Sequence, residues 1–183
     1  MRVAIVDLMT ATYAYDCLLA EAVAELVDDV TLYAGRSILA PRCFDGLTCK
    51  HYPGIAGILA QVGIPGATSS RVRNQSYWLD WVYLSARLWR RADSVLHIQW
   101  LPKLKRSDAE LGFVRRIQRS GVPVVYTVHN LLPHDFNGSS AVRGRYARIY
   151  RMADALITNT TCDREALIEQ FNIPHSKVFQ VGF

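Results

Sequence analysis

Strand-like and helix-like segments alternate along this chain almost from its first residue. Residues 3–8 form a short apolar run typical of a buried strand, and residues 17–27 follow with apolar side chains at helical spacing. Further strand patterns lie at residues 30–33, 94–98, 122–128, 155–158 and 177–181, separated by helix patterns at residues 77–91, 108–119, 140–152 and 162–171. This order is typical of a parallel sheet wrapped by helices. The sequence therefore predicts an α/β fold with a Rossmann-like parallel sheet.

The segment from residue 35 to residue 76 is less regular. It is rich in Gly and Pro and has no sustained period, so we expect excursions with one short strand at residues 49–52. In the helix predicted after it, Trp78, Trp81 and Trp89 recur at helical spacing. Such an aromatic stripe most simply packs against the sheet.

Composition narrows the class of protein. The chain has 183 residues, of which 50% are hydrophobic and 20% charged, as is ordinary for one soluble domain. It has no uninterrupted apolar run long enough for a membrane span, and its start is too short and too soon acidic for a signal peptide. The four cysteines are scattered, which predicts reduced thiols rather than a metal site or disulfide framework. These features predict a cytoplasmic protein.

Polar side chains follow four of the predicted strands. In an open parallel sheet the ligand crevice lies beyond the carboxyl ends of the strands, so these are candidate substrate-binding residues. His97 also fits a satisfied core histidine equally well, because it lies within the strand itself. The candidates are Thr10, Thr12, Tyr13, His97, Gln99, His129, Asn130, Asn159 and Thr160.

Several segments together resemble a known family. They are His-Ile-Gln-Trp-Leu at 97–101, Tyr-Thr-Val-His-Asn-Leu-Leu-Pro-His-Asp at 126–135, Tyr-Arg-Met-Ala-Asp-Ala-Leu-Ile-Thr at 150–158, and the ending at 171–182. The chain resembles the amino-terminal domain of glycosyltransferase family 4, retaining enzymes with the two-domain GT-B fold. The likeness is strong from Asp93 onward and absent from about residue 37 to residue 75.

The resemblance implies a function and separate roles for two domains. His129 matches the histidine that contacts the donor sugar, which makes it the predicted catalytic residue. The implied reaction moves a hexose from a nucleotide sugar to a glycan, often lipid-linked as in exopolysaccharide biosynthesis, without a metal cofactor. Residues 1–183 would be one acceptor-side domain. The nucleotide-sugar-binding domain is absent from this sequence, so we expect no turnover without it, whether it is supplied in cis or by a partner subunit.

The first loop departs from the family pattern. Family members commonly carry a glycine pair there, where the backbone approaches the donor diphosphate, but this chain has no Gly between Met1 and Ala34. Phosphate binding by this loop is therefore not predicted.

Basic residues cluster in two places. Arginines flank the Trp-bearing helix at positions 71, 73, 87, 90 and 91, a combination that suits the inner face of an anionic membrane and predicts peripheral contact. A second run comprises Arg143, Arg145, Arg148 and Arg151, for which we expect hydration.

Two other functions remain open. One is a non-catalytic acceptor-binding or membrane-anchoring subunit of a split glycosyltransferase. The other is a self-contained flavodoxin-like nucleotide binder, against which stands the lack of a glycine-rich phosphate loop after any predicted strand. The basic residues come in separate clusters with no nucleic-acid-binding module, so we expect no nucleic acid partner.

Overall fold

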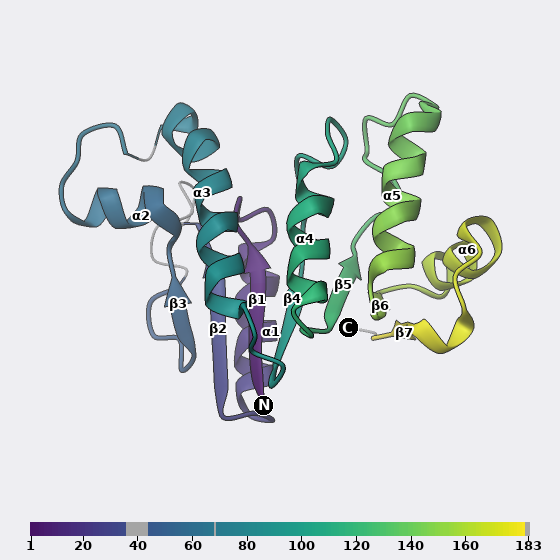
Figure 1. Cartoon of the computed structure of the whole chain (residues 1–183), viewed down its shortest axis with the longest axis horizontal. Coiled ribbons are helices and arrows are strands. Elements are labelled where there is room, and N and C mark those ends of the chain that lie inside the picture. The colour runs from purple at the N-terminus through teal and green to yellow at the C-terminus, as the bar shows by residue number, and fades with distance from the viewer. Residues whose placement is uncertain (36–43, 68, 182–183) are drawn as a thin grey trace.

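A seven-stranded parallel sheet forms the centre of the molecule (Figure 1). The computed structural model describes residues 1–35, 44–67 and 69–181, and within them the strand order is β3-β2-β1-β4-β5-β6-β7. Every neighbouring pair of strands is parallel, which confirms the predicted Rossmann-like α/β class. The strands are β1 (Arg2–Asp7), β2 (Asp29–Ala34), β3 (Lys50–Tyr52), β4 (Ser94–Ile98), β5 (Val124–Val128), β6 (Ala155–Thr158) and β7 (Val178–Gln180).

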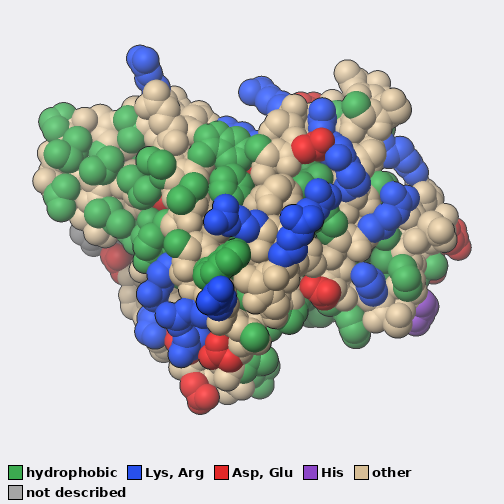
Figure 2. Space-filling model, in the orientation of Figure 1, with side chains coloured by type: hydrophobic (Ala, Val, Ile, Leu, Met, Phe, Trp, Pro, Cys, Tyr) green, Lys and Arg blue, Asp and Glu red, His purple; other side chains and the backbone are tan. Residues whose placement is uncertain are grey.

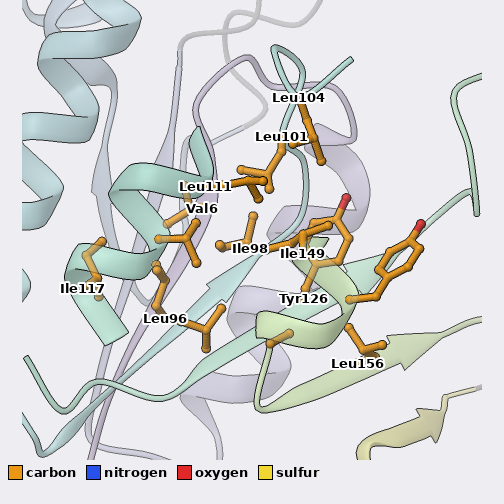
Figure 3. Close-up of a cluster of buried hydrophobic side chains, with 14 of the residues drawn as sticks. Val6, Leu96, Ile98, Leu101, Leu104, Leu111, Ile117, Tyr126, Ile149 and Leu156 are labelled. Carbon is orange, nitrogen blue, oxygen red and sulfur yellow. The ribbon is translucent and has the colours of Figure 1, made fainter. Parts of the chain in front are cut away.

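Helices cover the two faces of the sheet unequally. Alternate strand residues point to opposite faces, so in β1 Val6 joins a large core cluster while Ile5 joins a smaller one. The large cluster includes apolar side chains of α3 to α6, and the small one includes those of α1. Figure 3 shows part of the large cluster, where Leu111 and Ile149 meet strand residues such as Ile98. The helices are α1 (Tyr13–Ala24), α2 (Gly54–Gln61), α3 (Ser70–Leu88), α4 (Ala109–Arg119), α5 (Ser140–Met152) and α6 (Thr161–Phe171), and a 3-10 turn spans His175–Lys177.

The predicted helices and strands agree best with the structure in the second half of the chain. β4, α5 and β6 have the predicted bounds, and the other elements after β4 differ from them by one or two residues at an end. In the first half α1 begins at Tyr13 instead of residue 17, and α3 runs over Ser70–Leu88 instead of residues 77–91. Helix α2 was not predicted at all, because its short sequence is apolar on all sides and starts at a glycine.

The prediction of a buried Trp stripe was wrong for one member. Trp81 is fully buried and Trp78 packs against the same cluster, but Trp89 is 47% exposed. The reason is that α3 ends at Leu88, so that Trp89 has an extended backbone and leaves the helical face. Its ring lies under the guanidinium of Arg116, 5.5 Å from the ring centroid.

The basic run on α5 was also misjudged. Arg145 and Arg148 both pair with the carboxylate of Asp108, at N–O distances of 3.4 and 2.7 Å. The guanidinium of Arg143 lies 4.6 Å from the centroid of the Phe171 ring. These three arginines therefore tie α5 to neighbouring elements, where we had expected hydration.

Cys49 and Cys162 are free thiols, as predicted. Cys43 lies outside the described residues.

Candidate active site at the strand ends

The carboxyl ends of four neighbouring strands bring the predicted site residues to one edge of the sheet. In register, Val6 of β1 lies beside Ile98 of β4, and Ile98 lies beside Tyr126 of β5. Val128 of β5 then lies beside Thr158 of β6. The residues that follow these strands must therefore share one rim, which is where ligands bind in open parallel sheets.

His129 is held between two aromatic rings at this rim. Its imidazole stacks on Trp100, with centroids 5.2 Å apart and planes 7° apart, and the edge of Tyr15 meets it at 5.2 Å and 85°. The Nε2–H group donates to Oε1 of Gln99 at 3.0 Å, which leaves Nδ1 as an acceptor. Partial burial lowers the pKa of His129, so the ring is neutral near pH 7.

A chain of buried polar groups supports His129 from below. Gln99 is fully buried, and its Nε2 group donates to Nε2 of His97 at 3.1 Å. The same nitrogen of His97 lies 2.8 Å from the Thr127 hydroxyl. Burial, and secondarily the nearby His129, lower the pKa of His97 to about 4, so His97 also stays neutral. This series of hydrogen bonds fixes the orientation of the Gln99 amide. The Gln99 amide in turn fixes which ring nitrogen of His129 carries the proton.

The β1–α1 turn holds two of the predicted residues by internal hydrogen bonds. Thr10 has a positive φ of 56°, a conformation that usually favours Gly, and its hydroxyl donates to the Gly35 carbonyl at 2.5 Å. The Thr12 hydroxyl donates to Asp16 at 3.2 Å. Tyr13 packs against the small core cluster on the α1 side of the sheet rather than beside His129. In this turn Tyr15 is the residue that reaches the imidazole.

The remaining predicted residues lie farther along the rim. Asn130 contacts His134, with Nδ2 and Nε2 3.3 Å apart. Asn159 follows β6, and its side-chain oxygen is buried without a hydrogen-bond partner among the residues described. Thr160 accepts from the backbone N–H of Asp163 at 3.0 Å, so it caps α6, and its hydroxyl donates to the Asp163 carboxylate.

Comparison with known proteins identifies the family. A family model described as a glycosyl transferase 4-like domain matches residues 11–183. The chain belongs to this family. A search of curated proteins gives no match at the significance applied.

Solved structures of glycosyltransferases share the fold of this glycosyl transferase 4-like domain. A glycosyltransferase from Rickettsia africae aligns with a TM-score of 0.60 at 11% identity, over 98% of this chain and 42% of that one. Anabaena HepE in complex with UDP-glucose aligns with a TM-score of 0.61 at 12% identity, over 100% of this chain and 43% of that one. The domain thus spans less than half the length of these structures and has the fold of one half of a GT-B architecture.

Two structural surveys of the domain concern metals and membranes. Within residues 1–35, 44–67 and 69–181, no three His, Cys, Asp or Glu side chains are grouped as metal ligands. No helix in the same ranges combines the length and the apolar character needed to cross a bilayer.

Sequence reasoning missed three groups that contact or support His129. Trp100 directly follows β4, and its place beside a strand end was a usable signal. Thr127 could have been found from strand parity, because it shares a face of β5 with Val125, the register partner of His97. Tyr15 had no such signal, because its position depends on where α1 begins.

Proposed function

We propose that this domain is the acceptor-side half of a retaining glycosyltransferase that moves a hexose from a nucleotide sugar to a glycan acceptor. The observation that carries the proposal is the placement of His129, held by Trp100, Tyr15 and Gln99 at the rim of a glycosyl transferase 4-like domain. The structural relative HepE is described in complex with UDP-glucose, which supports a UDP-sugar as the donor.

In this proposal His129 orients the donor sugar through a hydrogen bond. A neutral, rigidly held imidazole costs little reorganisation when it meets a sugar hydroxyl, and its effect is greatest where water is excluded. Thr10, Thr12, Asn130 and Asn159 supply further neutral groups for hydroxyls of the donor or acceptor. Stabilisation of the departing nucleoside diphosphate, without a metal, falls to a second domain that lies outside these residues. Turnover therefore requires that domain in the same chain or in a partner subunit.

Replacing His129 in the complete enzyme tests the assignment. We expect His129→Ala to lower kcat/KM by about a hundredfold or more, the usual effect of removing one preorganised hydrogen-bond donor. Because the ring is half-buried at the rim, the melting temperature should change little. His175→Ala is the matched control. The His175 ring hydrogen-bonds to Arg164 in the turn before β7, so this variant should leave the rate unchanged. Near-normal transfer by His129→Ala would remove the assignment.

A second layer of the proposal is peripheral contact with an anionic membrane, which suits a lipid-linked acceptor and a location at the inner face. Figure 2 shows apolar side chains gathered over α2 and α3 with basic groups beside them. Val62, Leu79 and Val82 are 68%, 56% and 54% exposed, and Arg87 and Arg90 lie at the end of α3. A groove of about 350 Å³ continues this surface between α3 and α4, lined by Val82, Ser85, Ala86, Trp89, Phe113 and Arg116.

The same surface favours an alternative in which the domain is a non-catalytic subunit that binds acceptor or anchors a separate nucleotide-binding chain. Vesicle binding tests the membrane layer in both cases. We expect binding to vesicles rich in anionic lipid that weakens with salt. It should weaken about a hundredfold when Arg87, Arg90 and Arg91 are all changed to Gln, since each contributes about 1 kcal/mol. The matched triple change of Arg143, Arg148 and Arg151 on α5 should have a smaller effect. If the two triple variants weakened vesicle binding equally, the surface over α2 and α3 would not be the membrane-binding surface.

A further inference from the structure

Two aspartates are completely buried beneath the candidate site. Asp7 ends β1 and Asp16 lies in the first turn of α1, and neither has any exposed surface. Both carboxyl groups contact Thr12 and lie close enough together for the charge of Asp7 to act on Asp16. In the described part of the chain, no Lys, Arg or His forms an ion pair with either group. A buried acidic pair without a cation must be stabilised in another way.

The hydrogen-bond partners of the four carboxyl oxygens indicate how the acidic pair is stabilised. Oδ2 of Asp7 accepts from the backbone N–H of Thr12 at 3.0 Å, and Oδ1 of Asp16 accepts from the Thr12 hydroxyl at 3.2 Å. The other two oxygens, Oδ1 of Asp7 and Oδ2 of Asp16, are buried and receive no donor from the residues described. Two ionised carboxylates cannot share a buried site, whereas a single proton between them supplies a donor and removes one charge.

We propose that Asp7 and Asp16 share one proton and together act as positioning residues for the β1–α1 turn. The proposal deepens the proposed function, since this turn carries Thr10 and Thr12 and leads to Tyr15 beside His129. The backbone N–H of Thr12 donates to Oδ2 of Asp7 at 3.0 Å, and that of Thr10 donates to the main-chain carbonyl of Asp7 at 2.9 Å. Asp7 thus occupies two of the amides with which such a turn would otherwise bind phosphate. The turn is built for neutral sugar hydroxyls and excludes the donor diphosphate.

The surroundings favour retention of the proton. Burial raises the pKa of Asp7, and burial together with the charge of Asp7 raises the pKa of Asp16 to about 9. The titratable groups that face the pair are Tyr15 of α1 and Tyr77 of α3, and the pKa of each is raised first by burial and further by these carboxyls. A tyrosine side chain is either neutral or anionic, so neither one replaces the missing cation.

The shared proton has a definite effect on stability. The pKa of Asp16 is higher in the folded state than in the unfolded chain. At pH values between these two pKa values, the folded state therefore binds one proton more than the unfolded state. This contribution to stability is therefore complete at low pH and is lost as the pH rises towards 9. Asn at position 16 can donate an N–H to Asp7 in place of the proton and does not titrate.

Urea unfolding of the 183-residue chain and of Asp16→Asn against pH tests the proposal. The equilibrium constant for unfolding of the wild type, relative to that of Asp16→Asn, should rise about tenfold per pH unit. The window between about pH 7.5 and 8.5 isolates the pair, since burial raises the pKa of Glu110 only to about 7. Asp28→Asn, which removes an exposed carboxyl, should keep the wild-type slope. If the free energy of unfolding depended on pH in the same way for the wild type and for Asp16→Asn, the proposal of a shared proton would be wrong.

Carbon-13 NMR of the aspartate carboxyls gives a second test that does not depend on the variant folding. One of the two buried carboxyls should remain protonated at pH 7, and ionisation of both below about pH 5 would contradict the proposal. Inorganic pyrophosphate should leave the amide resonances of Thr10 and Thr12 unshifted, whereas a saturable shift would refute exclusion of the diphosphate. None of these measurements requires sugar transfer, so they can fail or succeed independently of the proposed enzyme activity.

Discussion

The two halves of the sheet have the same parallel architecture but are specified differently. After β4, helices α5 and α6 are preceded by the N-cap residues Ser139 and Thr160, each of which accepts a hydrogen bond from the helix it caps. Before β4, α1 and α2 have no side-chain cap, and α2 begins at Gly54 with a φ of 71°. A side-chain cap is not sufficient, because α3 is capped by Ser69 but begins seven residues before its predicted start, and it is not necessary, because α4 has no such cap but begins within one residue of its predicted start. For α1 and α2, which have no side-chain cap, contacts with residues distant in sequence contribute to where the helix forms.

The variant with the largest expected effect tests which tryptophan side chains are buried in the first half of the sheet. Trp81→Ala should lower the free energy of unfolding by about 3–5 kcal/mol, because the side chain is fully buried in the large core cluster. Trp89→Ala is the matched variant in the same stretch of sequence and should cost less than about 1 kcal/mol, since this ring is half-exposed. Urea unfolding measures both. Similar losses would mean that the end of α3 at Leu88 does not separate the two rings.

Helix α2 offers a smaller and more local test. The Asp80 carboxylate accepts from the Ile55 backbone N–H at 2.8 Å and from the Tyr52 hydroxyl at 3.1 Å, so it ties α2 and β3 to α3. Asp80→Ala should cost about 1–3 kcal/mol by leaving these donors without an acceptor. Amide hydrogen exchange in residues 54–61 should accelerate more than in α5.

Two controls sharpen that prediction. Asp80→Asn keeps an acceptor and should lose less stability than Asp80→Ala. Asp154→Ala removes the acceptor of the Val124 N–H, a comparable contact in the second half, and should leave exchange in α2 unchanged. If exchange in α2 were unaffected by Asp80→Ala, local sequence would be enough to form this helix.

The candidate site shows the same division between predictable and unpredictable parts. His97 lies near the end of β4, Gln99 and His129 follow β4 and β5, and the structure brings the three into one hydrogen-bonded chain. Their proximity follows from parallel register alone. The contribution of the first half is different, because the approach of Tyr15 to His129 depends on a turn held by Asp7 and by the positive φ of Thr10. Hydrophobic periodicity contains no information on such a turn, and neither aspartate was recognised from sequence.

The smallest effect is expected at the cap of α6. Thr160→Ala should lower the free energy of unfolding by about 1 kcal/mol, the usual cost of losing an N-cap side chain, because the Asp163 N–H loses its acceptor. Thr160→Ser keeps the hydroxyl and should be close to the wild type in the same denaturant titration. Thr12 occupies the corresponding position of α1 but makes no cap bond there, and its hydroxyl binds Asp16 instead. If the comparison between the halves holds, only Thr160→Ala should increase fraying of its helix by hydrogen exchange, whereas Thr12→Ala should act through the acidic pair and change the pH dependence of stability.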